Sequence, residues 1–276
     1  MKTEKLIEKY RASRELLIQN WIPVLILIAS VSSGLQIADN YSQNPPMSGG
    51  DPMTFEYAGW QLAEEGEPPY ESIFDVKTPL VYTFPGLLAL VSFGNPMIYH
   101  ALAVIFTSLA AISSIVIAGL FAYRETESEV AGLITGLSMI SITNYITMAA
   151  LGIRAKQYVI LFGVLSLYLY SRESYKLSGL TAAFSAGFYQ FGIIFALILL
   201  GRDLISERFS NTKEIVIGGF TGFLITVLPV IALGAGPEMI NQSVLAVLNG
   251  SDTQTLFGYL SRIYRSVLHL RYGIII

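Results

Sequence analysis

One stretch of the sequence, residues 38–79, holds the residue types best suited to chemistry. It contains eight acidic residues and a single basic one, Lys77, whereas the whole chain has 20 acidic and 17 basic residues. Connections between transmembrane helices are commonly short, so a polar stretch of this length is a candidate for function. A carboxylate can accept a proton and an ammonium group can bind a phosphate. The composition of this stretch therefore predicts a site that uses both.

Asp51 stands where a short helix is expected to begin. It precedes Pro52, and such a pair is typical of an N-cap and first turn, because proline has no N–H group to satisfy. Apolar residues then recur on one helical face as far as Gly66, while Glu56 is expected on another face. Two interpretations stay open for Asp51: a capping residue, or a carboxylate that does chemistry at a membrane surface.

Lys77 stands just before a second expected helix. Thr78 and Pro79 look like the N-cap and first turn of that helix. Backbone N–H groups, the positive end of the helix dipole and the Lys77 ammonium would then converge, an arrangement that suits a phosphate. At a membrane surface that phosphate belongs to a lipid. The alternative is an ion pair with Asp75, or a lysine that reaches along apolar surface towards water.

Composition places the chain in a membrane. Hydrophobic residues make up 53% of the 276 residues and charged residues 13%, against about 25% charged in soluble proteins. This excludes a soluble Rossmann or TIM-type enzyme, and a net charge of −3 without a basic run excludes a nucleic-acid binder. The absence of cysteine and the presence of only two histidines leave little for a zinc site. No cofactor is indicated, and a divalent metal ion stays open.

The apolar segments predict an all-α fold, a polytopic transmembrane helical bundle. Residues 1–20 form a basic amphipathic segment that we place on the cytoplasmic face, before a first span at 21–37. A cleaved signal peptide is the alternative. Residues 80–94 are short for a crossing, which takes about 20 residues, and contain Pro85, so we interpret them as an interfacial helix. The later spans are expected at 97–122, 130–149, 158–170, 177–200 and 215–236.

The topology of two segments stays open. Residues 177–200 form either one helix or two short halves joined near 190–192, and residues 80–94 either lie at the surface or cross. If they lie at the surface and 177–200 forms two halves, 11 Lys and Arg residues lie inside and 3 outside; the opposite choices give 10 and 4. Both versions place the N-terminus in the cytoplasm and residues 38–79 on the extracytoplasmic side of the cell membrane. We also expect the chain to be the front part of a longer protein.

The pattern of the acidic stretch resembles the first external loop of GT-C glycosyltransferases. The similarity is greatest to dolichyl-phosphate-mannose–protein mannosyltransferases and aminoarabinose transferases. The residues that carry it are Asp51, Gly66, Pro69, Tyr70, Asp75, Lys77, Pro79 and Tyr82. A looser resemblance continues along most of the chain. It implies one GT-C-like module over 1–276 with amphipathic juxtamembrane helices in the first external loop. It also implies a polyprenyl- or dolichyl-phosphate-linked sugar donor and transfer on the outer face.

The resemblance implies roles for individual residues. Asp51 matches the first-loop acid that acts as general base, and Lys77 matches the lysine that binds the donor phosphate. The second external loop of many relatives carries an acid, whereas this chain has Arg154 and Lys156 there. These two either assist with the phosphate or are ordinary interfacial basic residues. The candidate substrate-binding residues are Lys77, Asp75, Glu56, Tyr70, Arg154 and Lys156, and we expect His100 to be structural.

The leading hypothesis is a membrane glycosyltransferase that moves the sugar to an acceptor hydroxyl, with the acceptor unknown. A lipid phosphate is a good leaving group, so one carboxylate and one lysine would suffice, and a single displacement would invert the sugar. The alternatives are a transporter and a non-catalytic membrane protein that binds lipid phosphate. The expected spans are almost free of charge, which counts against a transporter.

Overall fold

The structure, a computed structural model of the chain, describes residues 18–42, 50–71, 73–142, 144–206 and 209–246. These residues form helices and connections without a strand, which confirms the predicted all-α membrane fold. In the described part, three helices are long and apolar enough to cross a membrane: α2 (Trp21–Ser42), α5 (Pro96–Thr126) and α11 (Phe209–Ala232). The predicted amphipathic segment 1–20 lies mostly outside the described residues.

The remaining helices are shorter. They are α3 (Asp51–Trp60), α4 (Leu80–Val91), α6 (Glu129–Ser141), α7 (Tyr145–Ala149), α8 (Ala155–Ser171), α9 (Tyr175–Phe188), α10 (Ile193–Ile205) and α12 (Gly236–Ile240). Single π-helical turns follow α3 at Gln61–Glu65 and α12 at Asn241–Leu245, and a 3₁₀ turn at Gln190–Gly192 joins α9 to α10.

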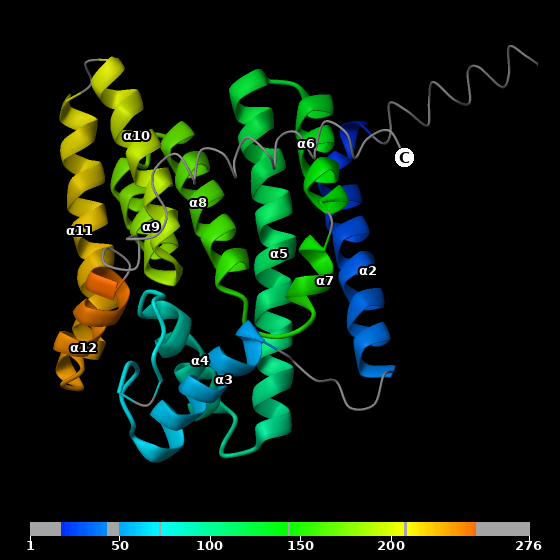
Figure 1. The fold of residues 1–276 in the computed structure, drawn as a ribbon. Coiled ribbons are helices and arrows are strands. Elements are labelled where there is room, and N and C mark those ends of the chain that lie inside the picture. The colour runs from blue at the N-terminus through cyan, green and yellow to red at the C-terminus, as the bar shows by residue number, and fades with distance from the viewer. Residues whose placement is uncertain (1–17, 43–49, 72, 143, 207–208, 247–276) are drawn as a thin grey trace, which may run out of the picture.

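The long helices stand side by side, whereas α3, α4 and α12 gather at one end of the bundle (Figure 1). We call this the loop end. At the opposite end, Arg124 donates to the main-chain oxygen of Ser171 at 3.4 Å, and Arg202 lies 3.5 Å from the carboxylate of Glu125. The connections that follow α5, α8 and α10 therefore meet at that opposite end. Helix α4 lies beside α3, and its position at a membrane interface stays a prediction.

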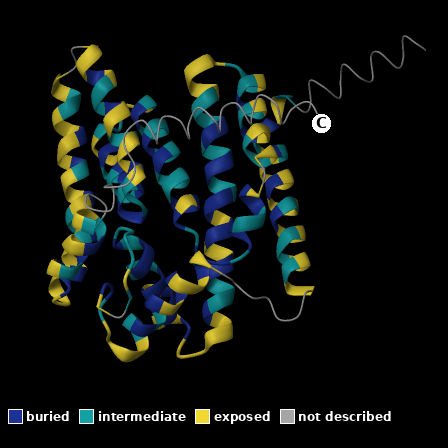
Figure 2. Ribbon diagram, in the orientation of Figure 1, coloured by how far each residue is buried: buried dark blue, intermediate teal, exposed yellow. Residues whose placement is uncertain are grey.

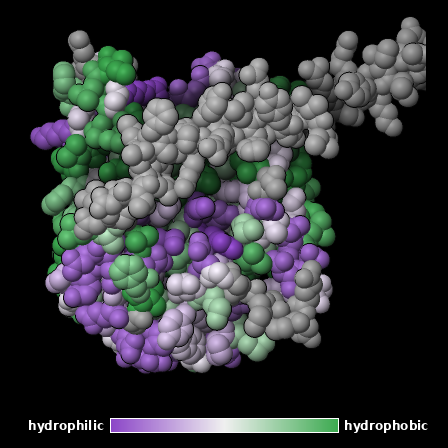
Figure 3. Space-filling view, in the orientation of Figure 1, coloured by the Kyte–Doolittle hydropathy of each residue, from purple (hydrophilic) through white to green (hydrophobic). Residues whose placement is uncertain are grey.

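Large apolar side chains remain exposed along the outer faces of α2, α10 and α11 (Figure 2). Hydrophilic residues gather over the loop end, and hydrophobic ones lie higher on the flank of the bundle (Figure 3). In water such an apolar exterior would be unstable, but in lipid it is the expected exterior of a helical bundle.

Residues 177–200 form two helices, which is the second of the two alternatives left open by the sequence. Tyr189 is extended (φ −162°, ψ 133°) and separates α9 from the 3₁₀ turn that begins α10. Helix α9 packs closely on α11, because Gly179 and Gly218 leave no side chain between the two backbones. A Cβ atom at Gly179 would clash with the carbonyl group of Ile215. The C-terminal end of α9 thus reaches the loop end (Figure 1).

The predicted span at 130–149 is wrong as a single helix. Helix α6 ends at Ser141, and the short α7 begins only at Tyr145. Asn144 has the left-handed conformation (φ 65°), which no helix interior tolerates. Because hydropathy alone continues through this region, the sequence pattern did not reveal the interruption.

Candidate active site at the loop end

Lys77 and Asp75 form an ion pair beside the aromatic ring of Phe55. The Lys77 ammonium lies 3.4 Å from each carboxylate oxygen of Asp75 and 4.9 Å from the centroid of the Phe55 ring. The side chains of Lys77 and Asp75 are only 19% and 13% exposed. The pair that the sequence left as an alternative therefore exists, but it is largely buried. A cation in such a shielded position acts more strongly on an incoming anion than one in open water.

The start of α4 differs from the prediction. Its N-cap is Pro79, and the Thr78 hydroxyl donates instead to the carbonyl oxygen of Ala186, at 2.8 Å, near the end of α9. The N–H groups of Val81 and Tyr82 donate to the carbonyl oxygens of Thr78 and Pro79. The predicted cap at Thr78 is therefore wrong, because the last carbonyl groups of α9 need a donor. The first turn of α4 offers fewer free N–H groups than predicted.

Tyr70 fixes the main chain that carries Lys77. It is 2% exposed, adopts a left-handed conformation (φ 74°), and its hydroxyl donates to the carbonyl oxygen of Lys77 at 2.7 Å. Burial, reinforced by the charge of Asp75, raises the pKa of Tyr70, so the hydroxyl stays a donor. The hydroxyl that the sequence suggested for the substrate is thus engaged by the protein.

Two glutamines hold the rest of this loop. The Gln242 amide donates to the carbonyl oxygen of Tyr70 at 2.6 Å and accepts the N–H of Asp75 at 3.0 Å. Gln190 donates to the carbonyl oxygen of Val76 at 3.1 Å. Sequence reasoning missed both glutamines, since a lone amide carries no motif and both lie more than 100 positions from their partners.

Asp51 lies exposed in the first turn of α3. The N-cap of this helix is Gly50 (φ 73°) and no side chain caps it, so the predicted N-cap role of Asp51 is wrong. Arg154 precedes α8 in the second loop at the same end, and its charge interacts with that of Asp51. Burial lowers the pKa of Arg154, and the negative charge of Asp51 counteracts this. Lys156, in the first turn of α8, is exposed.

Glu56 is buried, although the sequence pattern placed it off the apolar face of its helix. It is 7% exposed, and one carboxylate oxygen lies 2.8 Å from Nδ1 of His100. The other oxygen accepts the main-chain N–H of Ile153 at 3.1 Å, and the Tyr99 hydroxyl donates to the Glu56 carbonyl at 2.8 Å. Helix periodicity did not predict the burial of Glu56, because a carboxylate is expected to face solvent unless it has buried partners. Here those partners are distant in the sequence.

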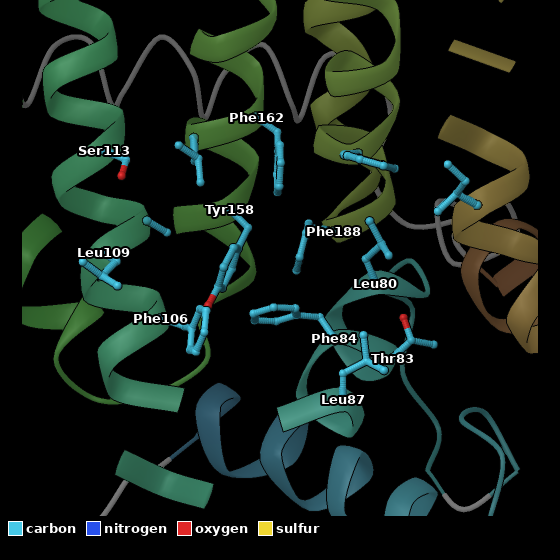
Figure 4. Close-up of a pocket in the computed structure, with 14 residues that line it drawn as sticks. Leu80, Thr83, Phe84, Leu87, Phe106, Leu109, Ser113, Tyr158, Phe162 and Phe188 are labelled. Atoms are coloured by element: carbon cyan, nitrogen blue, oxygen red, sulfur yellow. The ribbon is translucent and has the colours of Figure 1, made fainter. Parts of the chain in front are cut away.

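Two apolar cavities flank the start of α4. The first, which we call the α4 cavity, has a volume of about 570 Å³ and lies between α4, α5, α8 and α9 (Figure 4). Leu80, Phe84, Tyr158 and Phe188 contribute to its wall, and the last two rings stack at 4.5 Å. Its lining is almost entirely apolar, so it suits a hydrocarbon rather than a sugar.

The second cavity, which we call the α9–α11 cavity, has about the same volume, about 580 Å³. Helices α9, α10 and α11 form most of its wall, and Thr78, Pro79, Gln190 and Val244 line it at the loop end. Neither Asp51 nor Lys77 lines either of these two cavities. Lys77 is, however, the residue directly before Thr78. Among the described residues, no group of three His, Asp or Glu side chains could hold a metal ion.

Comparison with known proteins gives the family. A family model described as DolP-mannose mannosyltransferase matches residues 66–233, more than half of the chain. The chain belongs to the DolP-mannose mannosyltransferase family. The match begins at Gly66, so it includes Lys77 and Arg154 but not Asp51 or Glu56.

A curated protein that is similar to this chain supports the assignment to the DolP-mannose mannosyltransferase family. It is the dolichol phosphate-mannose mannosyltransferase of Haloferax volcanii, which is 32% identical over 230 residues. The aligned region covers 83% of this chain and 49% of the relative, so the chain spans about half the length of the curated protein that it matches. No solved structure matches the chain.

Proposed function

We propose that the protein transfers mannose from dolichyl-phosphate-mannose to a hydroxyl of an acceptor at a membrane surface. The observation that carries the proposal is the position of Lys77. The Lys77 ammonium is largely buried, and in the sequence Lys77 directly precedes Thr78 and Pro79, which line an apolar cavity. A lipid phosphate needs both features, a cation for the head group and a hydrocarbon site for the chain. Family membership and the activity for which the Haloferax relative is named agree with this donor.

The departing phosphate is the group that needs stabilisation. Negative charge grows on it as the bond to the sugar breaks, and the Lys77 ammonium offsets that charge. Asp75 holds the ammonium in place before the donor arrives, from 3.4 Å. The aromatic ring of Phe55, 4.9 Å from the ammonium, also limits the motion of the lysine. The protein therefore binds the donor with a cation that is already oriented.

Asp51 is the general base of the proposal. It is exposed at the first turn of α3, where an acceptor hydroxyl can approach from the surface. The carboxylate takes the proton of the hydroxyl as its oxygen attacks the anomeric carbon, and the dolichyl phosphate leaves. One displacement inverts the configuration at that carbon.

The α9–α11 cavity holds the first part of the isoprenoid chain. Thr78 and Pro79 connect it directly to Lys77, whereas the α4 cavity begins only at Leu80. The loop end then faces the outside of the cell membrane, and the N-terminus lies in the cytoplasm. The distribution of Lys and Arg supports this orientation.

The test is transfer by the full-length protein in lipid. We expect radiolabelled mannose to move from polyprenyl-phosphate-mannose to endogenous acceptor in membranes that contain the protein. Asp51→Asn should reduce the rate by about 100-fold or more, the scale of general base catalysis. Asp39→Asn is the matched control, since Asp39 is also an exposed acid, near the end of α2. Undiminished transfer by Asp51→Asn, with lipid binding intact, would remove Asp51 from the mechanism.

A further inference from the structure

The buried carboxylate of Glu56 joins three parts of the chain. Glu56 itself belongs to α3, the His100 imidazole comes from α5, and the N–H of Ile153 comes from the loop before α8. One carboxylate oxygen serves each partner, so the protein engages both. The Glu56 side chain, taken without its main-chain atoms, is only 10% exposed. A substrate hydroxyl would have to displace one of these partners to reach it.

The second loop is shaped to receive this carboxylate. Gly152 has φ +116°, a conformation that side chains rarely adopt, and a Cβ atom there would clash with the Glu56 carboxylate oxygen. The same Cβ would meet Pro52 at 3.4 Å, so the start of α3 packs directly on this loop. The backbone angle of Gly152 and the close approach of the Glu56 carboxylate to it therefore both require a glycine at this position of the second loop.

The contact between Glu56 and the second loop affects the position of Arg154. Arg154 directly follows Ile153, whose N–H is held by Glu56, and it lies two residues after Gly152, which packs against Pro52, the residue next to Asp51. The negative charge of Asp51 also acts to raise the pKa of Arg154. The Nε atom of Arg154 is buried and has no hydrogen-bond partner among the described residues. Fixing the backbone one residue earlier is a direct way to aim the guanidinium.

We propose that Glu56 is a positioning residue that holds the second loop against α3 and so keeps Arg154 beside Asp51. This assignment rests on the proposed function, in which Asp51 accepts the proton. The sequence suggested that Glu56 contacts the substrate. We assign it instead a contact with the main-chain N–H of Ile153. His100 anchors the other carboxylate oxygen and keeps the carboxylate in this orientation.

The decisive experiment is a double-mutant cycle in the full-length protein. Glu56→Gln and Arg154→Gln are made separately and together, and mannose transfer is measured as kcat and as the KM for donor. We expect each single variant to lower kcat about 10- to 100-fold, the scale of one lost charged hydrogen bond, with the donor KM changed less than about threefold. Once Arg154 is absent, Glu56→Gln should cost less than about threefold more. Glu65→Gln, an exposed acid of the same loop, is the matched control and should leave both constants unchanged.

Independent, multiplicative effects of the two substitutions would overturn the proposal, as would a rise in donor KM on Glu56→Gln that persists without Arg154. If Glu56→Gln does not fold, His100→Gln replaces it in the same cycle, because it removes the imidazole that holds the other oxygen of the carboxylate. The same coupling to Arg154 is then expected.

A second measurement separates this inference from the proposed function. The 276 residues contain no cysteine, so Leu151→Cys places a single thiol in the second loop of this chain. Glu56→Gln should increase its rate of labelling by a maleimide at least about threefold, and Glu65→Gln should not. Unchanged labelling would show that Glu56 does not hold the loop. A labelling response in a protein that transfers no mannose would refute the proposed function alone.

Discussion

Gln242 donates from its side-chain amide to the main-chain oxygen of Tyr70 at 2.6 Å, across 172 positions of sequence. The same amide group accepts the N–H of Asp75. The segment that follows α11 therefore holds the turn from which Asp75 and Lys77 project. Because the family match ends at residue 233, this contact is a property of the chain that the family assignment does not include.

Gln242→Leu should loosen the turn before Lys77. It removes two hydrogen bonds in a buried position, so the KM for the donor is expected to rise about 10-fold, while kcat falls less. The constants are measured with polyprenyl-phosphate-mannose and the full-length protein. Ser243→Ala is the control, because that hydroxyl donates within its own turn, to the carbonyl oxygen of Met239. Equal loss in both variants would argue for general damage to the turn after α12.

Lys77→Met should weaken donor binding most. The substitution keeps the length of the side chain but removes the lysine partner of the Asp75 carboxylate and the cation proposed for the phosphate. We expect binding of a fluorescent polyprenyl phosphate to weaken about 10- to 100-fold. Lys213→Met, an exposed lysine at the opposite end, should bind normally. Normal binding by Lys77→Met would mean that another group holds the phosphate.

Filling the cavities distinguishes their roles. Ala183→Phe narrows the α9–α11 cavity, and Ser113→Phe narrows the α4 cavity by a similar volume. We expect Ala183→Phe to reduce transfer from long-chain donors about 10-fold and to spare donors with a chain of one or two isoprene units. Rates for the two chain lengths are compared in each variant. A chain-length effect confined to Ser113→Phe would assign the donor chain to the α4 cavity.

Gly152→Ala should destabilise the protein. The new methyl group would meet the Glu56 carboxylate, and the backbone angle of +116° is unfavourable for alanine. These effects together amount to about 1–3 kcal/mol, which thermal unfolding in detergent would detect as a lower Tm. Gly34→Ala is the matched control, since nothing lies within 4 Å of a Cβ atom at that position in α2. Its Tm should stay the same or rise slightly, because alanine favours a helix.

Alkaline pH should destabilise the loop end through Tyr70. Its pKa is raised by burial in the folded protein, and the unfolded value is 10.0. Below pH 10 the hydroxyl is protonated in both states, so the tyrosine causes no pH dependence. Above pH 10 only the unfolded state releases the proton, and stability falls as pH rises. Tyr70→Phe should have a shallower loss of Tm between pH 10 and 11 than the unchanged protein; equal slopes would contradict this prediction.

The helical fold could be predicted because hydropathy is a local property of the sequence. The break after Phe188 could only be left open, since the glycines around it also occur inside continuous transmembrane helices. Asp51 and Lys77 could be named as candidates because both belong to a recognisable pattern, and their roles stay predictions. Helix starts were misplaced by one residue, as at Gly50, because Asp-Pro fits the N-cap and first turn as well as the first two helical positions.

The partners of the site residues were beyond prediction. Glu56 contacts His100 and Ile153, which lie 44 and 97 positions away in the sequence. Periodicity assigns a carboxylate to the solvent face unless a partner is known, and a single sequence does not reveal partners. The same reason hid Gln242 and Gln190, whose amides bond to main-chain atoms rather than to other side chains.

The division of residues 177–200 into α9 and α10 also decides at which end of the bundle the later part of the chain lies. Helix α9 runs towards the loop end and α10 returns, so the pair restores the direction in which the chain was travelling (Figure 1). With α4 lying at the loop end, one uninterrupted helix here would deliver the chain after α11 to the far side of the bundle. The even number of passes in this hairpin is what allows an amide from position 242 to meet a carbonyl from position 70.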